Sequence, residues 1–377
     1  MLRLTPTTWL LLGDKRGDNG QVEAVAAALG WPCDRKNLVM KARYQRAKPR
    51  FRATLDHLDL DRSDSLEAPW PELIITSGRR PAMAALWVRR QSANRTRVVH
   101  IGKPSGAMHE FGLVVASGEN HLPPLANYLP ITLPLMRVSV DSIQAEAERW
   151  RSRLRELQRP LIALLVGGPT GPFRMPARVA RALVTEVARI RALGGTAYVV
   201  TSRRTPAAVV KTLRRRLPAE VPFFAWPADA PPEGAPSPIE NPYRALLGTA
   251  DGFVVTGDSI SMLVEVAALG KPLAILPLPT GLLGGVDQLR RRWQRKLFSP
   301  RCETRADRFR QALARCIYRW DRLGLLNGTR DFCYFHQLLV ERHLAVWAGQ
   351  PLRIGGTLPP DDLDVVVERI RALVHRS

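Results

Sequence analysis

The chain has 377 residues, 45% of them hydrophobic, which is enough for two cores of ordinary size and therefore predicts two domains. Its 56 Lys and Arg residues exceed its 34 Asp and Glu residues, and the formal net charge of +22 favours anionic partners such as nucleic acid, an acidic membrane surface or phosphorylated small molecules. No apolar run is long enough to cross a bilayer, and the four cysteines form no CxxC pair and have no histidine spaced to complete a zinc site. We therefore expect a cytoplasmic protein that binds no metal and is either soluble or peripheral on the inner membrane.

In the first half of the chain, short apolar runs alternate with helical patterns. Strands are predicted at residues 8–13, 72–78, 98–102 and 112–117. Helices are predicted at residues 21–31 and 81–90. Continuous apolar runs joined by helices are typical of buried parallel strands, so this half is expected to form an α/β sheet.

The second half repeats this alternation. Strands are predicted at residues 161–168, 197–202, 252–257 and 273–279. Helices are predicted at residues 175–195, 206–217 and 261–270. Two turns also echo each other across the halves, because TSGRRP and TSRRTP each lie between a strand and a helix. The pattern therefore predicts two similar Rossmann-like domains.

The domain boundaries follow from the positions of these runs. We expect a first domain over residues 1–140, a charged linker helix over 141–159 and a second domain over 160–298. The remaining residues, 299–377, are less regular and are expected to form a helical extension that packs back on the first domain.

The turn after the first predicted strand reads GDKRGDNGQ, residues 13–21. In open α/β sheets, ligands bind beyond the carboxyl ends of the strands, and glycines in such a turn let a ligand approach the backbone. A helix cap by Asp18, completed by Gln21, explains part of this turn but not its four charged residues. The turn matches neither GxGxxG nor GxxxxGK[ST], so it predicts neither a dinucleotide fingerprint nor a P-loop.

Two further kinds of turn are suited to phosphate. GGPTG at residues 167–171 has paired glycines and a hydroxyl that suit a diphosphate, although a plain tight turn has the same composition. The pairs Arg79-Arg80 and Arg203-Arg204 present guanidinium forks that match phosphate oxygens, the alternative being that these arginines are simply solvated.

Glu265 is the one carboxylate in the apolar helical stretch SMLVEVAALG. A solvated face is the usual place for a helical glutamate, but no basic residue appears here before Lys271. A carboxylate that faces a ligand accepts hydrogen bonds from vicinal hydroxyls, as acidic residues do for ribose in nucleotide folds. Beside the Gly/Ser turn TGDSIS, Glu265 predicts a nucleotide-sugar site.

The stretch from Asn241 to Pro279 resembles the donor region of GT-B glycosyltransferases and is most similar to the lipid-linked N-acetylglucosaminyltransferase of peptidoglycan synthesis. The shared pattern is a strand, a Ser/Gly turn, a helix with a glutamate, and Gly-x-Pro. The resemblance implies a GT-B-like α/β fold, in which the parallel sheets of two Rossmann-like domains face an interdomain cleft. It implies that Glu265 holds the ribose. The other donor-site residues are expected to be Gly167, Gly168, Thr170, Ser202, Arg203, Gly257, Asp258, Ser259 and Ser261.

Up to about Pro279 the chain is also similar to the bacterial "mitochondrial fission" family, named after a plant member that acts in organelle division. This resemblance rests on the motifs GDKRGDNGQ, TSGRRPA, IGKPSG, LLVGGPTGPF, TSRRTP and TGDSISMLVEVA. The histidine of the glycosyltransferase's first glycine-rich loop is absent from GDKRGDNG, so a catalytic base would have to be Asp18 or Asp14.

A strongly basic segment follows the last predicted strand, at residues 287–298. Its apolar residues fall on one helical face and its cations on the other, a composition typical of an interfacial helix on anionic lipid. Arg291, Arg292 and Trp293 are therefore expected to contact a membrane. The alternative is a basic surface helix that docks its apolar stripe on its own domain. No RRM, KH, helix-turn-helix or zinc-finger signature predicts a specific nucleic-acid partner.

These inferences predict an inverting, metal-independent glycosyltransferase. Its donor would be a nucleotide-sugar, expected to be UDP-linked, with no further cofactor, and its acceptor would be anionic or lipid-linked. The residues expected to bind the acceptor or phosphate are Lys15, Arg16, Asn19, Arg79, Arg80, Lys103 and Ser105. The alternative function is a non-catalytic, membrane-associated scaffold that recruits a division or fission partner.

Overall fold

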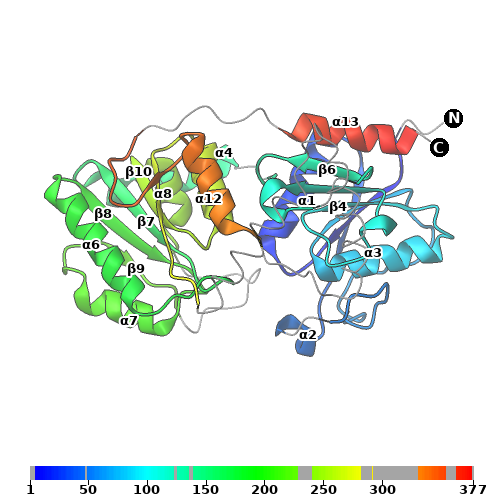
Figure 1. Cartoon of the computed structure of the whole chain (residues 1–377), viewed down its shortest axis with the longest axis horizontal. Coiled ribbons are helices and arrows are strands. Elements are labelled where there is room, and N and C mark those ends of the chain that lie inside the picture. The colour runs from blue at the N-terminus through cyan, green and yellow to red at the C-terminus, as the bar shows by residue number, and fades with distance from the viewer. Residues whose placement is uncertain are drawn as a thin grey trace, which may run out of the picture. The chain divides into compact units, whose positions relative to one another are not determined.

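A computed structural model describes residues 5–46, 49–122, 125–135, 139–227, 240–281, 291, 330–353 and 362–375 (Figure 1). The chain separates into two compact units. Unit 1 comprises residues 1–137, 290–331 and 359–377, and unit 2 comprises residues 138–289 and 332–358. Each unit is therefore built from stretches of chain that are far apart in the sequence.

Unit 1 contains a six-stranded parallel sheet in the order β2-β1-β3-β4-β5-β6. Its central strands are short apolar runs that are buried on both faces, as expected when helices cover both sides of a parallel sheet. The strands are β1 (Thr8–Leu12), β2 (Cys33–Asn37), β3 (Leu73–Ser77), β4 (Arg97–Ile101), β5 (Leu113–Ser117) and β6 (Tyr128–Ile131).

Alternate residues of each strand in unit 1 enter different cores, because successive side chains of a strand point to opposite faces. On one face Trp9 and Leu11 pack with α3 (Arg79–Gln91). On the other face Leu10 and Leu12 pack with α1 (Arg16–Leu29) and α13 (Asp362–His375). Helices α1 and α13 lie side by side (Figure 1). The unit also contains α2 (Ala42–Arg46) and the 3-10 turns η1 (Met108–Glu110) and η2 (Gly118–Asn120).

Unit 2 contains a second six-stranded parallel sheet, in the order β12-β11-β10-β7-β8-β9. Counted within the unit this is the order 3-2-1-4-5-6 of the Rossmann fold, read from the opposite edge. The strands are β7 (Leu161–Val166), β8 (Thr196–Thr201), β9 (Phe223–Phe224), β10 (Gly252–Thr256), β11 (Leu273–Leu276) and β12 (Val346–Trp347). The fold class is thus the predicted one, α/β with two Rossmann-like parallel sheets.

Unit 2 has two helices before its first strand and further helices between its strands. They are α4 (Val140–Arg149), α5 (Arg151–Arg155), α6 (Arg178–Ala192), α7 (Ala207–Arg216), α8 (Tyr243–Thr249), α9 (Ile260–Ala268) and α12 (Phe332–Glu341). Helix α4 packs on α8 within the unit, and a side chain at Gly248 would touch Ala147 at 2.9 Å. The stretch expected to be a linker helix is therefore held in unit 2. The stretch expected to be a C-terminal extension contributes α12 and β12 to unit 2 and α13 to unit 1.

Candidate functional site

The chain order of the strands in unit 2 reverses between β7 and β10, which are neighbours in the sheet. Such a switch point leaves a crevice beyond the carboxyl ends of the two strands, where ligands of open α/β sheets bind. The turn after β7 carries Gly167 and Gly168, and the turn after β10 carries Gly257, Asp258 and Ser259. Two of the turns predicted to bind the donor therefore meet at one place.

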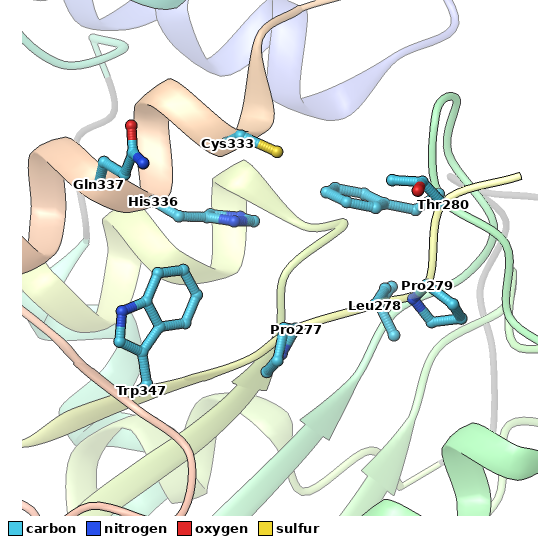
Figure 2. Close-up of a pocket in the computed structure, with 9 residues that line it drawn as sticks. Pro277, Leu278, Pro279, Thr280, Cys333, His336, Gln337 and Trp347 are labelled. Carbon is cyan, nitrogen blue, oxygen red and sulfur yellow. The ribbon is translucent and has the colours of Figure 1, made fainter. Parts of the chain in front are cut away.

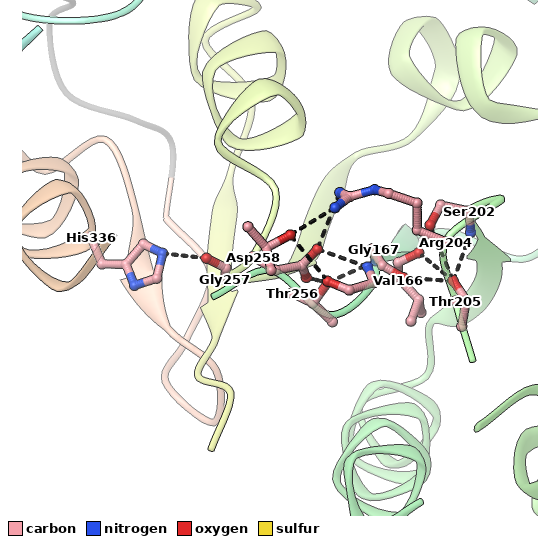
Figure 3. A network of polar contacts seen from close by, with 11 residues as sticks. Val166, Gly167, Ser202, Arg204, Thr205, Thr256, Gly257, Asp258 and His336 are labelled. Carbon is pink, nitrogen blue, oxygen red and sulfur yellow. Dashed lines mark hydrogen bonds and ion pairs between the residues drawn. The ribbon is translucent and has the colours of Figure 1, made fainter. Parts of the chain in front are cut away.

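The Asp258 carboxylate joins these two turns (Figure 3). Its Oδ1 accepts a hydrogen bond from the Thr256 hydroxyl at 2.7 Å, and its Oδ2 accepts one from the Gly168 N–H at 2.7 Å. The side chain is 0% exposed. Burial raises the pKa of the Asp258 carboxyl above its ordinary value, although the hydrogen bonds from Thr256 and Gly168 oppose that rise. Asp258 was expected beside a donor diphosphate, but its two oxygens bind protein groups.

The paired glycines allow this close contact. A Cβ at Gly167 would lie 2.1 Å from Asp258 Oδ2, and a Cβ at Gly168 would lie 2.3 Å from the carbonyl oxygen of Arg204. The Gly167 N–H donates to the Thr256 hydroxyl at 2.8 Å, and the Gly168 N–H donates to Asp258. Both amides are thus engaged inside the protein, and the glycines bring two turns together rather than offering these amides to a diphosphate.

Arg204 lies in the turn after β8, and it belongs to the pair Arg203-Arg204 that was expected to suit phosphate, although only Arg203 was assigned to the donor site. Its Nη1 donates to Thr170 Oγ1 at 2.7 Å, and its Nη2 lies 3.5 Å from Asp258 Oδ2. The side chain is about half exposed, so part of it is open to solvent. Ser202 belongs to the same turn, and its N–H donates to Thr205 Oγ1 at 3.0 Å. Arg203 is exposed beside them.

Glu265 lies on α9, the helix that follows the Asp258 turn. Its Oε2 accepts a hydrogen bond from the Tyr243 hydroxyl of α8 at 2.5 Å. Burial raises the pKa of the Glu265 carboxyl, and the bond from Tyr243 opposes that rise. Burial and the nearby carboxylate of Glu265 raise the pKa of Tyr243 well above its ordinary value, so a neutral phenol donates to the carboxylate. Among the described residues Tyr243 is the one hydrogen-bond partner of this carboxylate, whose second oxygen has capacity to accept further bonds.

Helix α9 begins at Ile260, two residues after Asp258. Ser259 is the N-cap residue, and in the described part of the chain its side chain makes no capping hydrogen bond. The helix has no acidic residue in its first turn. The leading N–H groups of a helix have no acceptor within it and attract anions. Ser261 is half-buried in this turn, so the N-terminus of α9 is suited to bind a phosphate beside Arg204.

A pocket of about 410 Å³ opens beyond the carboxyl end of β11 (Figure 2). His336 and Cys333 of α12 face the segment after β11 across it. The His336 ring stacks on Phe173 with a centroid distance of 5.9 Å and meets Trp347 edge-on at 6.1 Å. Its Nε2 lies 2.7 Å from the carbonyl oxygen of Gly257, which links the pocket to the Asp258 turn. The lining residues are Phe173, Pro277, Leu278, Pro279, Thr280, Cys333, His336, Gln337 and Trp347.

Unit 1 has its own switch point, between β1 and β3. Asp18 lies there, and a Cβ at Gly78 of the β3 turn would lie 3.0 Å from its Oδ2. Lys15 Nζ and Arg330 Nη2 each lie 4.0 Å from an Asp18 oxygen. The expected cap by Asp18 is wrong, because α1 begins at Arg16 and its N-cap residue is Lys15. Asp18 is therefore in the first turn of the helix, where the helix dipole favours a carboxylate.

The other predicted site residues of unit 1 are held by hydrogen bonds and an ion pair. Asn19 closes the loop after β1, since its Oδ1 accepts from the Gly13 N–H at 3.0 Å and its Nδ2 donates to the Gly13 carbonyl oxygen at 2.8 Å. Asp14 pairs with Arg80 Nη1 at 3.2 Å, which joins two predicted site residues from different turns. Arg79 Nε donates to the Pro49 carbonyl oxygen at 3.0 Å, and burial lowers its pKa.

A polar cluster beyond the end of β5 gave no sequence signal. His121 Nε2 lies 2.9 Å from Asp331 Oδ2, and the two side chains are 10% and 2% exposed. His121 has a φ of 44°, a left-handed backbone that is uncommon for a residue other than glycine and is frequent at functional sites. Next to it, buried Glu119 accepts from the Ser117 hydroxyl at 2.6 Å, and burial raises the pKa of its carboxyl. Arg330, which approaches Asp18, is the residue before Asp331.

The remaining predicted residues are less informative. Lys103 and Ser105 lie half-buried in the turn after β4, the strand next to β3. Arg291 was expected at a membrane, but it is 3% exposed and donates to the carbonyl oxygen of Arg330. A guanidinium buried in this way presents no charge to a membrane. Arg292, Trp293 and the side chain of Arg16 lie outside the described residues.

Within the described ranges, no three metal-ligating side chains gather where they could hold one ion. Over the same ranges, no helix combines the length and the apolar character needed to span a bilayer.

The family described as Mitochondrial fission ELM1 matches residues 16–318. The mitochondrial fission protein ELM1 of Arabidopsis thaliana is 24% identical over 232 residues, which are 56% of this chain and 52% of that protein. The chain thus matches about half the length of this curated relative.

Solved structures of similar topology have low sequence identity. UDP-GlcNAc 2-epimerase from Neisseria meningitidis, solved with UDP-GlcNAc, gives a TM-score of 0.48 at 11% identity and covers 97% of this chain and 100% of its own. MurG from Acinetobacter baumannii gives a TM-score of 0.37 at 14% identity, covering 89% of this chain and 100% of its own. Structural similarity at these TM-scores and identities gives no information about the ligand or the reaction of this chain.

Proposed function

The chain belongs to the mitochondrial fission ELM1 family, whose name states no chemistry, and from the switch-point site of unit 2 we propose that it transfers a sugar from a nucleotide-sugar to an anionic or lipid-linked acceptor. The observation that carries this proposal is the meeting of Arg204, Thr170 and the N-terminus of α9 at the place where a Rossmann-order sheet binds its ligand. Glu265 lies on the same helix, and the second oxygen of its carboxylate has capacity to accept from ribose hydroxyls.

Each part of the donor has a group suited to it. The ribose hydroxyls would donate to Glu265, and the diphosphate would accept from the leading N–H groups of α9 and from Arg204. The aromatic pocket beside Gly257 is large enough for one ring of the donor, and Gln337 and Thr280 offer it polar contacts. UDP is the proposed nucleotide.

The reaction proposed is a direct displacement with inversion. A base takes the proton from an acceptor hydroxyl, whose oxygen bonds to the anomeric carbon. The bond from that carbon to the diphosphate breaks, and the leaving nucleoside diphosphate carries the electron pair. Arg204 and the helix amides would stabilise the charge that develops on the leaving group, without a metal.

The experiment is a thermal-shift comparison of UDP, UDP-GlcNAc and ADP on the full chain. A ligand that binds only the folded state stabilises it by about 2.7 kcal/mol at a hundred times its dissociation constant, so UDP and UDP-GlcNAc are expected to raise the melting temperature by several degrees. ADP is expected to raise it less. An unchanged melting temperature with all three at millimolar concentration would refute the nucleotide-sugar proposal and favour the non-catalytic scaffold.

Asp18 remains the proposed base, and its removal should stop turnover while leaving donor binding intact. General-base catalysis contributes about 10² to 10⁴ in rate, so Asp18→Asn should slow UDP release from UDP-GlcNAc in a lipid extract by at least 100-fold. The affinity for UDP should stay within about twofold, because the base acts on the acceptor rather than the donor.

Two histidine variants complete this experiment. His121→Gln tests the second candidate base, because His121 is held by Asp331 in the arrangement that orients an imidazole for proton transfer. His343→Gln is the control, because His343 has a similar left-handed backbone (φ 58°) and an exposed side chain. If His121→Gln stops turnover and Asp18→Asn does not, the base is His121 and the assignment of Asp18 is wrong.

A further inference from the structure

Helices α6 and α7 pack against each other (Figure 1). Their solvent-exposed residues are strongly basic. We use the name α6–α7 basic face for the exposed cations of these helices, which are Arg178, Arg181, Lys211, Arg214, Arg215 and Arg216. This face is separate from the switch-point site, since none of these residues belongs to the network around Asp258.

Ion pairing does not neutralise this face. Among the described residues, none of its six cations lies within ion-pair distance of a carboxylate. Their neighbours on α6 behave differently. Arg189 pairs with Glu186 at 2.9 Å, and Arg191 pairs with Glu220. The same helix therefore carries both paired and unpaired arginines, and the unpaired ones are those of its first turn.

Helix stability explains only part of the face. Arg214, Arg215 and Arg216 end α7, where the helix dipole favours cations. Arg178 and Arg181 lie instead in the first turn of α6, where the dipole disfavours cations and where no acidic residue compensates. These two arginines therefore do not stabilise the helix, which indicates that they have a function other than folding.

The shape and composition of the face identify the kind of partner. The exposed residues between the cations are small, namely Ala182, Thr185, Ala188, Ala207 and Ala208. Such residues let a flat surface approach closely. Leu193, which follows α6, is 71% exposed and offers one apolar side chain to that surface. Neither helix contains an aromatic residue on which a nucleic-acid base could stack.

We propose that the α6–α7 basic face binds the phosphate headgroups of an anionic lipid bilayer. Clusters of this size on helices bind anionic lipid, and guanidinium groups match phosphate oxygens. The proposal does not depend on transferase activity. It also differs from the contact expected at Arg291, since that side chain is buried.

The test is sedimentation of the full chain with vesicles of phosphatidylcholine, with or without about one-third phosphatidylglycerol. Each cation near an anionic bilayer strengthens binding about fivefold. Arg178→Glu combined with Arg181→Glu should therefore weaken binding to the anionic vesicles by at least about twentyfold. This variant places acids in the first turn of α6, where the dipole favours them, so it should fold normally. Salt near 1 M, at which the Debye length is about 3 Å, should release the wild type.

The matched control is Arg155→Glu combined with Arg342→Glu, which makes the same change in net charge at exposed positions elsewhere in unit 2. It should bind anionic vesicles within about twofold of the wild type. Equal weakening of both double variants would show that attachment depends on overall charge, and the proposal would be overturned. Displacement of the protein from vesicles by an equal concentration of RNA phosphate would overturn it in favour of nucleic acid. Because no nucleotide is present, failure here leaves the proposed donor site untouched.

Discussion

Gly168→Ala is expected to destabilise unit 2 by about 2–5 kcal/mol, the combined size of an overpacked methyl group and a buried carboxylate that loses a hydrogen bond. The added Cβ would lie 2.3 Å from the carbonyl oxygen of Arg204 and 2.4 Å from its Cβ, so the backbone of the β8 turn would have to move. That movement would separate the Gly168 N–H from Asp258, which is buried and depends on this bond. Urea unfolding, followed by a probe in unit 2, measures the loss.

Gly20→Ala is the control for this substitution. Gly20 lies within α1, and a Cβ there would meet no other atom within 4 Å. Alanine is favoured over glycine in a helix by about 1 kcal/mol, so the control should leave the chain as stable or more stable. If Gly168→Ala left the unfolding midpoint of unit 2 unchanged, the two turns would not be held as tightly as this geometry indicates.

Glu265→Ala is expected to raise the dissociation constant of UDP by about 5- to 150-fold, which corresponds to about 1–3 kcal/mol for a charge-assisted hydrogen bond. The proposed cause is the loss of the acceptor for the ribose hydroxyls. Calorimetry with UDP and with 2′-deoxy-UDP tests this cause directly. The wild type should prefer UDP, and the variant should bind the two nucleotides with similar affinity.

Tyr243→Phe separates this role from a structural one. It removes the hydrogen bond to Glu265 Oε2 at 2.5 Å and keeps the carboxylate, so UDP should bind within about threefold of the wild type. If the hydrogen bond between Tyr243 and Glu265 served only the stability of the fold, the two variants would behave differently from this expectation. Both variants would then lower the melting temperature alike, and Glu265→Ala would bind UDP as tightly as the wild type does.

The central strands could be predicted from the sequence, and the edge strands could not. Strands β1, β3, β4, β5, β7, β8, β10 and β11 lie where apolar runs predicted them. The four that were missed, β2, β6, β9 and β12, are the edges of the two sheets. An edge strand is covered less completely, so its sequence need not be apolar. The residues of β2, Cys-Asp-Arg-Lys-Asn, show this most clearly.

The sequence located the switch-point turns of both units, but it did not predict which groups bind one another there. Position after a strand is a local property, and it identified Gly167, Asp258 and Asp18. Hydrogen-bond partners depend on neighbouring turns. The pairing of Asp258 with Gly168 joins residues 90 positions apart, and that of His121 with Asp331 joins residues 210 positions apart. No local pattern encodes such pairs, which is why His336 and Asp331 were missed and why Arg203 rather than Arg204 was assigned to the donor site.

The place of α13 in unit 1 has a consequence for how the protein is made. Leu363, Val366, Val367 and Ile370 of this helix complete the core formed by β1, β3 and α1. A ribosome adds about 5–20 residues per second, so α13 follows residue 137 by roughly 10–45 s, after every segment of unit 2 has been synthesised. During that interval the growing chain exposes the apolar surface that α13 later covers, and a chaperone has time to bind it. The unit whose sheet is synthesised first is thus the last to have its core completed.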